Sequence, residues 1–281
     1  MNTERGVRAY LSWFLAFLVL LASGIAFGRL FFRFDQPHTA DLPEIRVAAA
    51  SDLYAAMPEL VEAFEAEQGG QVRVVPVLGS SGQLARQIEQ GAPYHVFLSA
   101  NRDYVRRLSD SGAIMPDSVR PYARGPLVLA FAQSIEIAAS GLDALTDPAI
   151  RSIALANPDH APYGMAGRQA LQHAGLWDEL QPKIVFGQSI QNAAQFVRSG
   201  QAEAGLIARS LVPDPSLRWE PVPADLHDPI DQYLGIVADR ERLDSAQAFC
   251  EFLVSEQGQA ILRRFGFEPA GGTLLPEVES D

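Results

Sequence analysis

Short apolar runs rich in β-forming residues alternate with amphipathic segments along the first half of the region that follows the amino-terminal 40 residues. The predicted strands lie at 45–50, 72–77 and 96–99, and the predicted helices at 52–68 and 83–90. In the first helix the apolar positions recur at intervals of three and four, which is typical of one buried face. They are Leu53, Met57, Leu60, Val61 and Phe64. Alternating strands and helices predict an α/β fold with mainly parallel sheets.

The same alternation returns after Pro126. The predicted strands are 127–132, 153–156, 184–186, 204–207 and 233–238, and the predicted helices are 165–174, 191–199 and 245–265. The last helix is expected to break near Gly258. Two sets of about 100 residues each match the usual size of a domain, so two α/β lobes are predicted.

The amino-terminal segment differs from the rest of the chain. Residues 11–27 carry no charge and follow Arg5 and Arg8, which is the pattern of an export signal. The apolar run is longer than in most signals and shorter than the 20 or so residues of a spanning helix. We therefore predict that 1–28 is a signal peptide or a membrane anchor, followed by a linker at 29–43. The protein is expected in the periplasm, either soluble after signal cleavage or anchored to the inner membrane through residues 9–28.

Composition narrows the function classes. The chain has 34 acidic and 22 basic side chains, a net charge of -12, and the part after residue 40 carries -14 because the first 40 residues are net basic. Binding to nucleic acid requires clustered Lys and Arg, so a nucleic-acid partner is not expected. The single cysteine, Cys250, excludes an internal disulfide and a site with several cysteine ligands, and its apolar neighbours predict a buried thiol.

Candidate chemistry lies where predicted strands lead into helices. Ser51 and the turn 79–82 each follow a strand and precede a helix, while 162–164 and 187–190 precede helices in the second half. A helix amino terminus offers free N–H groups and a favourable dipole to an anion. Ligands in open α/β sheets bind beyond the carboxyl ends of the strands. Together the four turns predict a site for a small anion between the lobes.

Each turn alone has an ordinary explanation. Ser51 fits a simple helix N-cap, and Gly and Ser are common in turns such as 79–82. That turn lacks the lysine of a P-loop, and Gln83 stands where a G-x-S-x-G turn needs glycine. An exported serine hydrolase with Ser51 or Ser81 as nucleophile remains a remote alternative, since no triad motif surrounds the histidines. We therefore do not expect an enzyme.

The chain closely resembles the molybdate-binding periplasmic proteins of ABC importers. The resemblance starts with VAAASDLYAAMPELVEAFEAEQGGQVRVVPVLGSSGQLARQIEQGAPYHVFLSAN and continues in NPDHAPYGMAGRQAL, GQSIQNAAQFVRSGQAEAGLIARS and AFCEFLVSEQGQAILRRFGFEP. It spans about residues 45–269. It implies a type II periplasmic binding protein with two hinge crossovers. Lobe I would comprise 44–125 plus 232–271, lobe II would comprise 126–231, and 272–281 would be a carboxyl-terminal tail.

The resemblance also implies the binding residues. Ser51 and Ser81 would donate from their side chains to an oxyanion, and Tyr163 and Ile190 would donate from their backbone N–H groups. Further candidates are Ser80, Ser189 and Ser210. The metal of the oxyanion would be held through its oxygens, with no protein atom bonded to it, and no cofactor is expected.

Three positions depart from the family pattern. Ala208 stands where some members place a tyrosine hydroxyl on the anion, His95 belongs to GAPYHVF in place of the frequent GAPADVF, and Asn101 replaces a frequent aspartate. Ser210 could supply the donor that Ala208 lacks. A binding role for His95 stays open beside the ordinary role of a packed strand residue.

The predicted function is capture of a tetrahedral oxyanion, molybdate and also tungstate, and its delivery by a monomer to an importer permease. A cleft with donors alone suits a fully deprotonated dianion, because the proton of hydrogen phosphate needs an acceptor. Sulfate, thiosulfate or phosphate as the ligand, and a membrane-anchored oxyanion sensor, are the alternatives.

Overall fold

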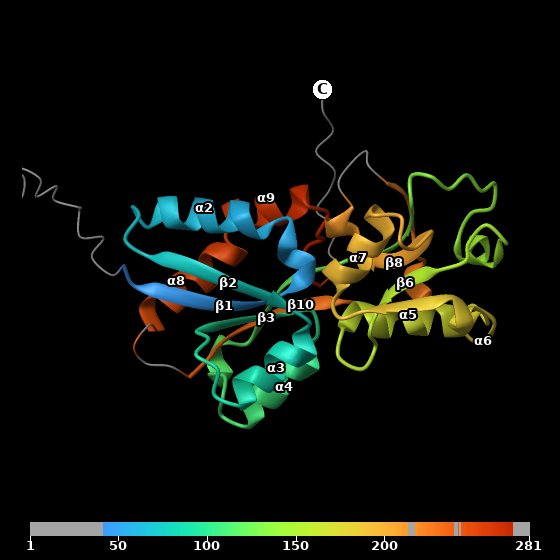
Figure 1. Ribbon diagram of the computed structural model, residues 1–281. Helices are drawn as coiled ribbons and strands as arrows, with labels where there is room; N and C mark the ends of the chain where they lie inside the picture. The colour runs from blue at the N-terminus through green and yellow to red at the C-terminus, as the bar shows by residue number, and fades with distance from the viewer. Residues whose placement is uncertain (1–41, 213–216, 239–240, 242, 272–281) are drawn as a thin grey trace, which may run out of the picture. The chain divides into compact units, whose positions relative to one another are not determined.

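The computed structural model describes residues 42–212, 217–238, 241 and 243–271. The predicted signal or anchor at 1–28 and the tail at 272–281 lie outside this part. The described helices and strands all belong to the unit formed by residues 43–281 and build two five-stranded sheets (Figure 1). Within the described ranges, no helix has both the length and the apolar character needed to cross a bilayer.

The first sheet has the strand order β2-β1-β3-β10-β4. Its strands are β1 (Glu44–Ala50), β2 (Arg73–Gly79), β3 (Val96–Ser99), β4 (Arg120–Arg124) and β10 (Asp231–Ile236). Strand β1 runs parallel to β2 and β3, whereas β10 is antiparallel to β3 and β4. We call this sheet and its helices lobe I.

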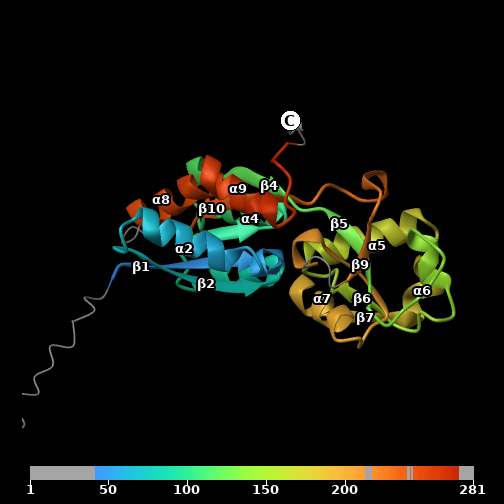
Figure 2. The same ribbon diagram turned by 90° about the horizontal axis from the view of Figure 1, so that it is seen from above.

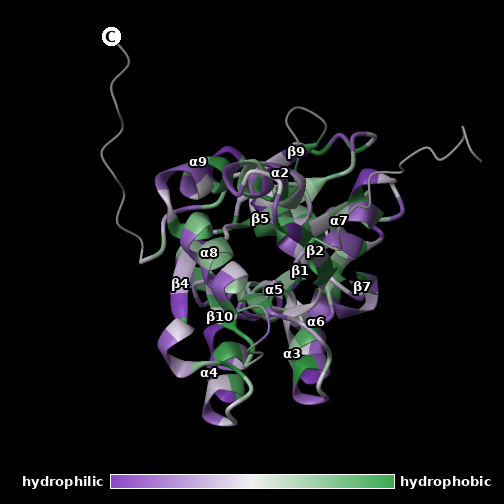
Figure 3. Cartoon of the chain, turned by 90° about the vertical axis from the view of Figure 1, so that its left-hand side faces the viewer, coloured by the Kyte–Doolittle hydropathy of each residue, from purple (hydrophilic) through white to green (hydrophobic). Residues whose placement is uncertain are grey.

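Both faces of the first sheet are covered by helices. The helices are α2 (Met57–Glu67), α3 (Ser81–Glu89), α4 (Arg102–Asp110), α8 (Leu243–Val254) and α9 (Glu256–Arg264). Side chains on α2 and α8 pack over one face, where the rings of Phe64 and Phe249 meet edge to face at 5.1 Å between centroids. Helices α3 and α4 cover the other face (Figure 1). In Figure 3 the central strands are coloured as hydrophobic and the outer turns of α9 as hydrophilic, as expected for a sheet buried on both sides.

The second sheet has the order β7-β6-β8-β5-β9 and, with its helices, forms lobe II. Its strands are β5 (Leu127–Phe131), β6 (Ile153–Ala156), β7 (Ile184–Gly187), β8 (Ala204–Ala208) and β9 (Arg218–Pro221), and its helices are α5 (Pro162–His173), α6 (Trp177–Leu180) and α7 (Ile190–Arg198). Strand β6 is parallel to β7 and β8, and β5 is antiparallel to β8 and β9. Short 3-10 turns complete the fold: η1 (Ser51–Tyr54), η2 (Pro116–Ser118), η3 (Leu142–Thr146), η4 (Gln181–Lys183), η5 (Arg209–Leu211) and η6 (Ala224–Leu226).

The chain passes from the first sheet to the second between β4 and β5 and returns between β9 and β10, as can be followed in Figure 2. At the first of these crossovers Gly125 has no room for a side chain, since a Cβ there would collide with the hydroxyl of Tyr163. Because the chain changes sheets twice, both predicted crossovers are present. The predicted residue limits of the lobes stay a prediction.

The predicted α/β fold class is confirmed, and both sheets are mixed, with two parallel and two antiparallel pairings each. Two predicted elements were wrong. The helix expected at 52–68 is a 3-10 turn followed by α2, which starts at Met57 with Pro58 in its first turn, where a missing N–H is tolerated. The last helix breaks at Ser255 rather than near Gly258, because the Ser255 side chain accepts from the Gly258 N–H and starts α9.

Candidate functional site

The predicted turns meet around one small cavity. Its lining comes from the ends of β1, β2 and β3 in lobe I and from the starts of α5 and α7 in lobe II, and its empty volume is about 190 Å³. The lining residues are Ala50, Ser51, Asp52, Gly79, Ser80, Ser81, Ala100, Ala161, Pro162, Tyr163 and Ile190. The four residues predicted to bind the anion therefore lie in the same cavity, at the carboxyl ends of parallel strands.

Ser51 is the first residue of η1 and is only 2% exposed. Its hydroxyl has no hydrogen-bond partner in the structure, and it does not cap the turn, where Ala50 holds the N-cap position. The alternative of an ordinary N-cap is therefore wrong for Ser51. A buried hydroxyl without a partner costs about 1–3 kcal/mol, so Ser51 is a candidate donor for a molecule that enters the cavity.

The cavity also collects unpaired N–H groups. Ser81 and Ile190 are the first residues of α3 and α7, and Tyr163 is the second residue of α5. No hydrogen bond within the described part of the chain uses the backbone N–H of these three residues, which is the usual state of a first helical turn. The Ser81 hydroxyl accepts from the Ala100 N–H at 3.0 Å and keeps its own proton for a further acceptor.

The three further serine candidates already have partners for their hydroxyls. Ser80 lines the cavity, but its hydroxyl donates to the backbone carbonyl of His160. The Ser189 hydroxyl caps α7 by accepting from the Asn192 N–H at 3.2 Å, and the Ser210 hydroxyl donates to the Asp52 carbonyl at 2.8 Å. Neither Ser189 nor Ser210 lines the cavity. The ligand role of Ser80, Ser189 and Ser210 stays a prediction, because each hydroxyl would have to change its present hydrogen bond before it could bind an anion.

The cavity contains a carboxyl group that the sequence analysis missed. Asp52 is fully buried, and its Oδ2 accepts from the Tyr163 hydroxyl at 3.0 Å and from Gln232 Nε2 at 2.7 Å. Its Oδ1 has no hydrogen-bond partner. Burial raises the pKa of Asp52 from 3.8 to about 6, although the Tyr163 hydroxyl, the Gln232 amide and nearby backbone N–H groups lower it. The sequence placed Asp52 at a helix start, where an acidic residue is ordinary.

Asp52 joins the two lobes through a buried hydrogen-bond network. In lobe I, Gln232 on β10 receives a bond from the Tyr122 hydroxyl at 3.2 Å. In lobe II, Tyr163 on α5 and Ser210 in η5 bond to the side chain and the carbonyl of Asp52. Burial and the charge of Asp52 hold the pKa values of Tyr122 and Tyr163 well above their ordinary value, so both tyrosines remain neutral donors. Asp52, which is one of the residues that line the cavity, therefore also ties the lobes together.

The positions that depart from the family pattern lie outside the cavity lining. Ala208 ends β8 as a buried methyl group, which cannot donate a hydrogen bond. His95 lies just before β3, and its Nδ1 accepts from the Arg46 N–H at 2.8 Å. Asn101 caps α4 by accepting from the Asp103 N–H at 2.7 Å.

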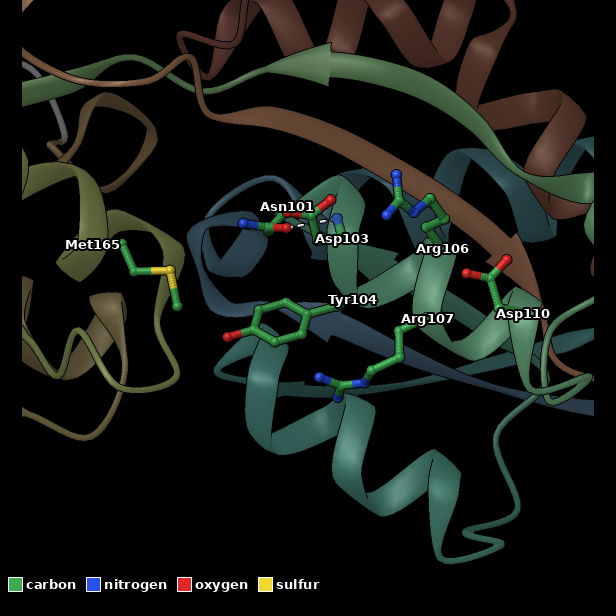
Figure 4. Close-up of a pocket in the computed structure, with 7 residues that line it drawn as sticks. All are labelled: Asn101, Asp103, Tyr104, Arg106, Arg107, Asp110 and Met165. Atoms are coloured by element: carbon green, nitrogen blue, oxygen red, sulfur yellow. Dashed lines mark hydrogen bonds between the residues drawn. The ribbon is translucent and has the colours of Figure 1, made fainter.

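A second, wider hollow lies beside α4 and contains none of the predicted binding residues (Figure 4). Figure 4 shows Tyr104 of α4 pointing towards Met165 of α5. Arg107, which also lines this hollow, is paired with Glu89 at 2.8 Å and lies over the Tyr104 ring. An ion in this hollow would meet side chains that are already paired or solvated, so the smaller cavity is the better anion site.

The described residues do not favour metal or thiol chemistry. Within those ranges, no three His, Cys, Asp or Glu side chains come together in a way that could hold a metal ion. Cys250 is buried, as its apolar neighbours predicted, and burial raises its pKa to about 12, which leaves an inert thiol.

The alternative of a serine hydrolase needs a serine beside a histidine base. The serine that lies beside His160 is Ser80, not Ser51 or Ser81, and its hydroxyl donates to a carbonyl instead of to the imidazole.

Comparisons with known proteins agree with this geometry. A family model described as bacterial extracellular solute-binding protein matches residues 45–268. The molybdate-binding protein ModA of Rhodobacter capsulatus is 33% identical over 226 residues, 80% of this chain and 88% of that protein. ModA of Azotobacter vinelandii is 34% identical over 233 residues, which are 81% of this chain and 91% of that protein. The solved structure of the Azotobacter vinelandii periplasmic molybdate-binding protein matches with a TM-score of 0.75 at 31% identity, over 79% of this chain and 98% of that one.

Proposed function

Because the chain belongs to the bacterial extracellular solute-binding protein family, we propose that it captures a tetrahedral oxyanion, molybdate and also tungstate, and delivers it to an ABC importer. The observation that carries the proposal is the buried hydroxyl of Ser51. It has no hydrogen-bond partner, and Ser51 lines a cavity that is surrounded by helix amino termini. Two relatives that match over about 80% of the chain are named as molybdate-binding proteins.

The donors of the cavity suit a tetrahedral anion. The hydroxyls of Ser51 and Ser81 and the backbone N–H groups of Ser81, Tyr163 and Ile190 supply hydrogen bonds from both lobes. Hydrogen bonds to a charged group contribute about 1.5–3 kcal/mol each, and the dipoles of α3, α5 and α7 add to them. An anion held in this way needs no positively charged side chain, which fits a protein that is acidic overall.

Capture also depends on how the lobes meet. Besides the bonds of Asp52, the Gly82 N–H of lobe I donates to the His160 carbonyl of lobe II at 3.0 Å. An anion that accepts from both lobes would add to these contacts and favour the arrangement in which the cavity is enclosed, a hinge motion typical of periplasmic binding proteins. A permease would then recognise the loaded protein by this arrangement.

The remaining parts of the proposal concern partners and location. The protein would act outside the cytoplasm as a monomeric carrier without catalytic activity, with the importer permease as its partner and no cofactor. Residues 1–28 would be removed on export, or residues 9–28 would hold the protein at the membrane. An intact amino terminus in the purified membrane fraction would favour an anchored protein, including the alternative of an oxyanion sensor.

Asp52 gives a specific reason to keep hydrogen phosphate as a second candidate. An ionised carboxylate in the cavity is the acceptor that the proton of hydrogen phosphate requires. Sulfate and thiosulfate offer no proton and would have to be distinguished from molybdate by the size of the cavity.

The test is a calorimetric titration of the full chain with molybdate, tungstate, sulfate, thiosulfate and phosphate. We expect nanomolar to micromolar dissociation constants for molybdate and tungstate and little binding of sulfate. Heat with sulfate or phosphate but none with molybdate would contradict the proposal and favour the competing anion.

A further inference from the structure

Asp52 supplies the only carboxyl group among the residues that line the cavity. It is completely buried, and its two oxygens differ: Oδ2 accepts two hydrogen bonds, whereas Oδ1 accepts none. A dianion bound beside an ionised Asp52 would place three negative charges in one buried space, and charges of like sign at such distances are strongly unfavourable. The cavity thus needs a way to remove the charge of Asp52 when the anion enters.

The hydrogen bonds of Asp52 determine where a proton would sit. Oδ2 already faces the donors Tyr163 and Gln232, so a proton there would face other protons. Oδ1 is the oxygen without a donor, and a carboxyl group protonated at this atom becomes a hydrogen-bond donor. The protonated side chain would then match the other groups of the cavity, which are hydroxyl and N–H donors.

We propose that the cavity takes up each oxyanion together with one proton, which binds to Asp52 Oδ1 and is donated in a hydrogen bond to an oxygen of the anion. The inference rests on the proposed function. A buffer acid or water releases the proton to the carboxylate and leaves as its conjugate base, and no other covalent bond is made or broken. The cavity then contains the two charges of the anion alone, and Asp52 changes from a repelling group into a ligand.

Among the residues that line the cavity, Asp52 is the group that titrates near neutral pH. Tyr122 and Tyr163 stay neutral, as described above, and no charged side chain acts on the pKa of Asp52, which burial raises to about 6. The charged residues on the elements packed against η1 are bonded to other groups, exposed, or placed at distant strand ends. On α2, Glu65 accepts from the Val74 N–H at 2.8 Å, and Glu62 and Glu67 are exposed. Arg209 donates to the Val212 carbonyl and Arg198 donates to Gln195. Glu59 pairs with Arg264. The charged residues at the strand ends opposite the cavity are Glu44, Arg46 and Arg73.

His160 is the other titratable group near the cavity. Its Nδ1 lies 2.9 Å from the Ser80 hydroxyl, and burial together with Arg86 lowers its pKa, while Asp159 raises it. A histidine with a lowered pKa is neutral at neutral pH. Since it could also take up a proton when an anion binds, the experiment has to distinguish His160 from Asp52.

The test measures proton uptake during molybdate binding by the full chain. Titrations in buffers with different ionisation enthalpies, between about pH 6 and about pH 8, give the dissociation constant and the number of protons bound. With a ligand-free pKa of about 6, the wild-type protein should take up about one proton per anion at about pH 8, and its affinity should fall roughly 50-fold across this range. Molybdate binding without proton uptake and with constant affinity would overturn the inference and leave the proposed function intact. Absence of binding by every oxyanion would overturn both.

Two variants assign the proton to Asp52. In Asp52→Asn the amide oxygen can still accept from Tyr163 and Gln232, while the NH₂ group presents a donor in place of the protonated Oδ1. This variant should bind molybdate with constant affinity and without proton uptake. The matched control Asp103→Asn removes an exposed carboxylate outside the cavity and should keep the wild-type pH dependence. Proton uptake that persists in Asp52→Asn would overturn the inference and assign the proton to His160.

Discussion

Two carboxylates, Asp52 in the cavity and Glu203 just before β8, are both largely withdrawn from solvent but have opposite surroundings. Glu203, with a side chain 12% exposed, accepts from the backbone N–H and the hydroxyl of Ser152 and from the backbone N–H and the guanidinium of Arg151. Burial raises its pKa, but the bonds from Ser152 and Arg151 outweigh burial and lower the pKa to about 2. Asp52, with one oxygen unpaired, has a pKa raised to about 6.

The difference separates a structural carboxylate from one that lines the proposed anion cavity. Glu203 holds the chain before β6 against the start of β8, and all of its donors come from the protein. In the cavity, Ser51 and Asp52 keep atoms without partners, although buried polar groups in native proteins are nearly always paired. Such groups are retained where an incoming molecule completes the pairing.

The largest expected effect concerns stability at Asp52. A pKa raised from 3.8 to about 6 means that the folded state holds the proton more tightly than the unfolded state, so stability falls as pH rises through this range and is constant above it. Two pKa units correspond to about 3 kcal/mol. Ligand-free Asp52→Asn should therefore be more stable than the wild type above about pH 7, by up to about 3 kcal/mol in denaturant unfolding. A less stable variant would show that the charge of Asp52 is compensated in the fold.

Ser51→Ala and Ser81→Ala should each weaken molybdate binding by about 1–3 kcal/mol, roughly 5- to 150-fold, because each removes a hydrogen bond to a charge. Ser51→Ala should leave the stability of the ligand-free protein unchanged or higher, since its hydroxyl has no partner to lose. Calorimetry and thermal unfolding on the same samples measure both effects. Unchanged affinity in both variants would remove the proposed site.

Glu203→Gln should show the reverse pattern. The amide oxygen can still accept from Ser152, but without the negative charge these bonds are weaker, which should lower the free energy of unfolding at neutral pH by about 1–2 kcal/mol, whereas the exposed Arg151 contributes little. The pKa of Glu203 is lowered, so its stabilisation is present above the ordinary value of 4.5 and is lost as pH falls towards about 2. Molybdate affinity should not change. A loss of affinity would mean that Glu203 influences the cavity and is not a purely structural carboxylate.

His95→Gln is expected to have the smallest effect. His95 accepts a backbone hydrogen bond and does not line the cavity, and the glutamine oxygen can accept in its place. The dissociation constant for molybdate and its pH dependence should match those of the wild type in the same titration. A changed pH profile would revive the binding role that the sequence analysis left open for this histidine.

Much of this arrangement follows from local sequence. The predicted family is confirmed by the match over residues 45–268 and by relatives at 33–34% identity. Ser51, Ser81, Tyr163 and Ile190 share one cavity because each follows a strand end or lies in the first turn of a helix. Asp52 could not be recognised in the same way, because Gln232 and Tyr163 lie 180 and 111 residues away from it and no local pattern predicts burial at that position. The strands β4 and β9 and the helices α4 and α6 were also missed. Both strands are short edge strands that mix polar and apolar residues, so their hydrophobic pattern is weak.

The most direct test of the central claim is the position of the anion in the protein. Crystals of the full chain grown with molybdate, measured at the molybdenum absorption edge, locate the metal without assumptions about its ligands. The anomalous peak should lie in the cavity, with the anion oxygens within about 3 Å of the hydroxyls of Ser51 and Ser81 and of the N–H groups of Tyr163 and Ile190. A peak outside this cavity, or no bound molybdate at saturating concentration, would contradict the account.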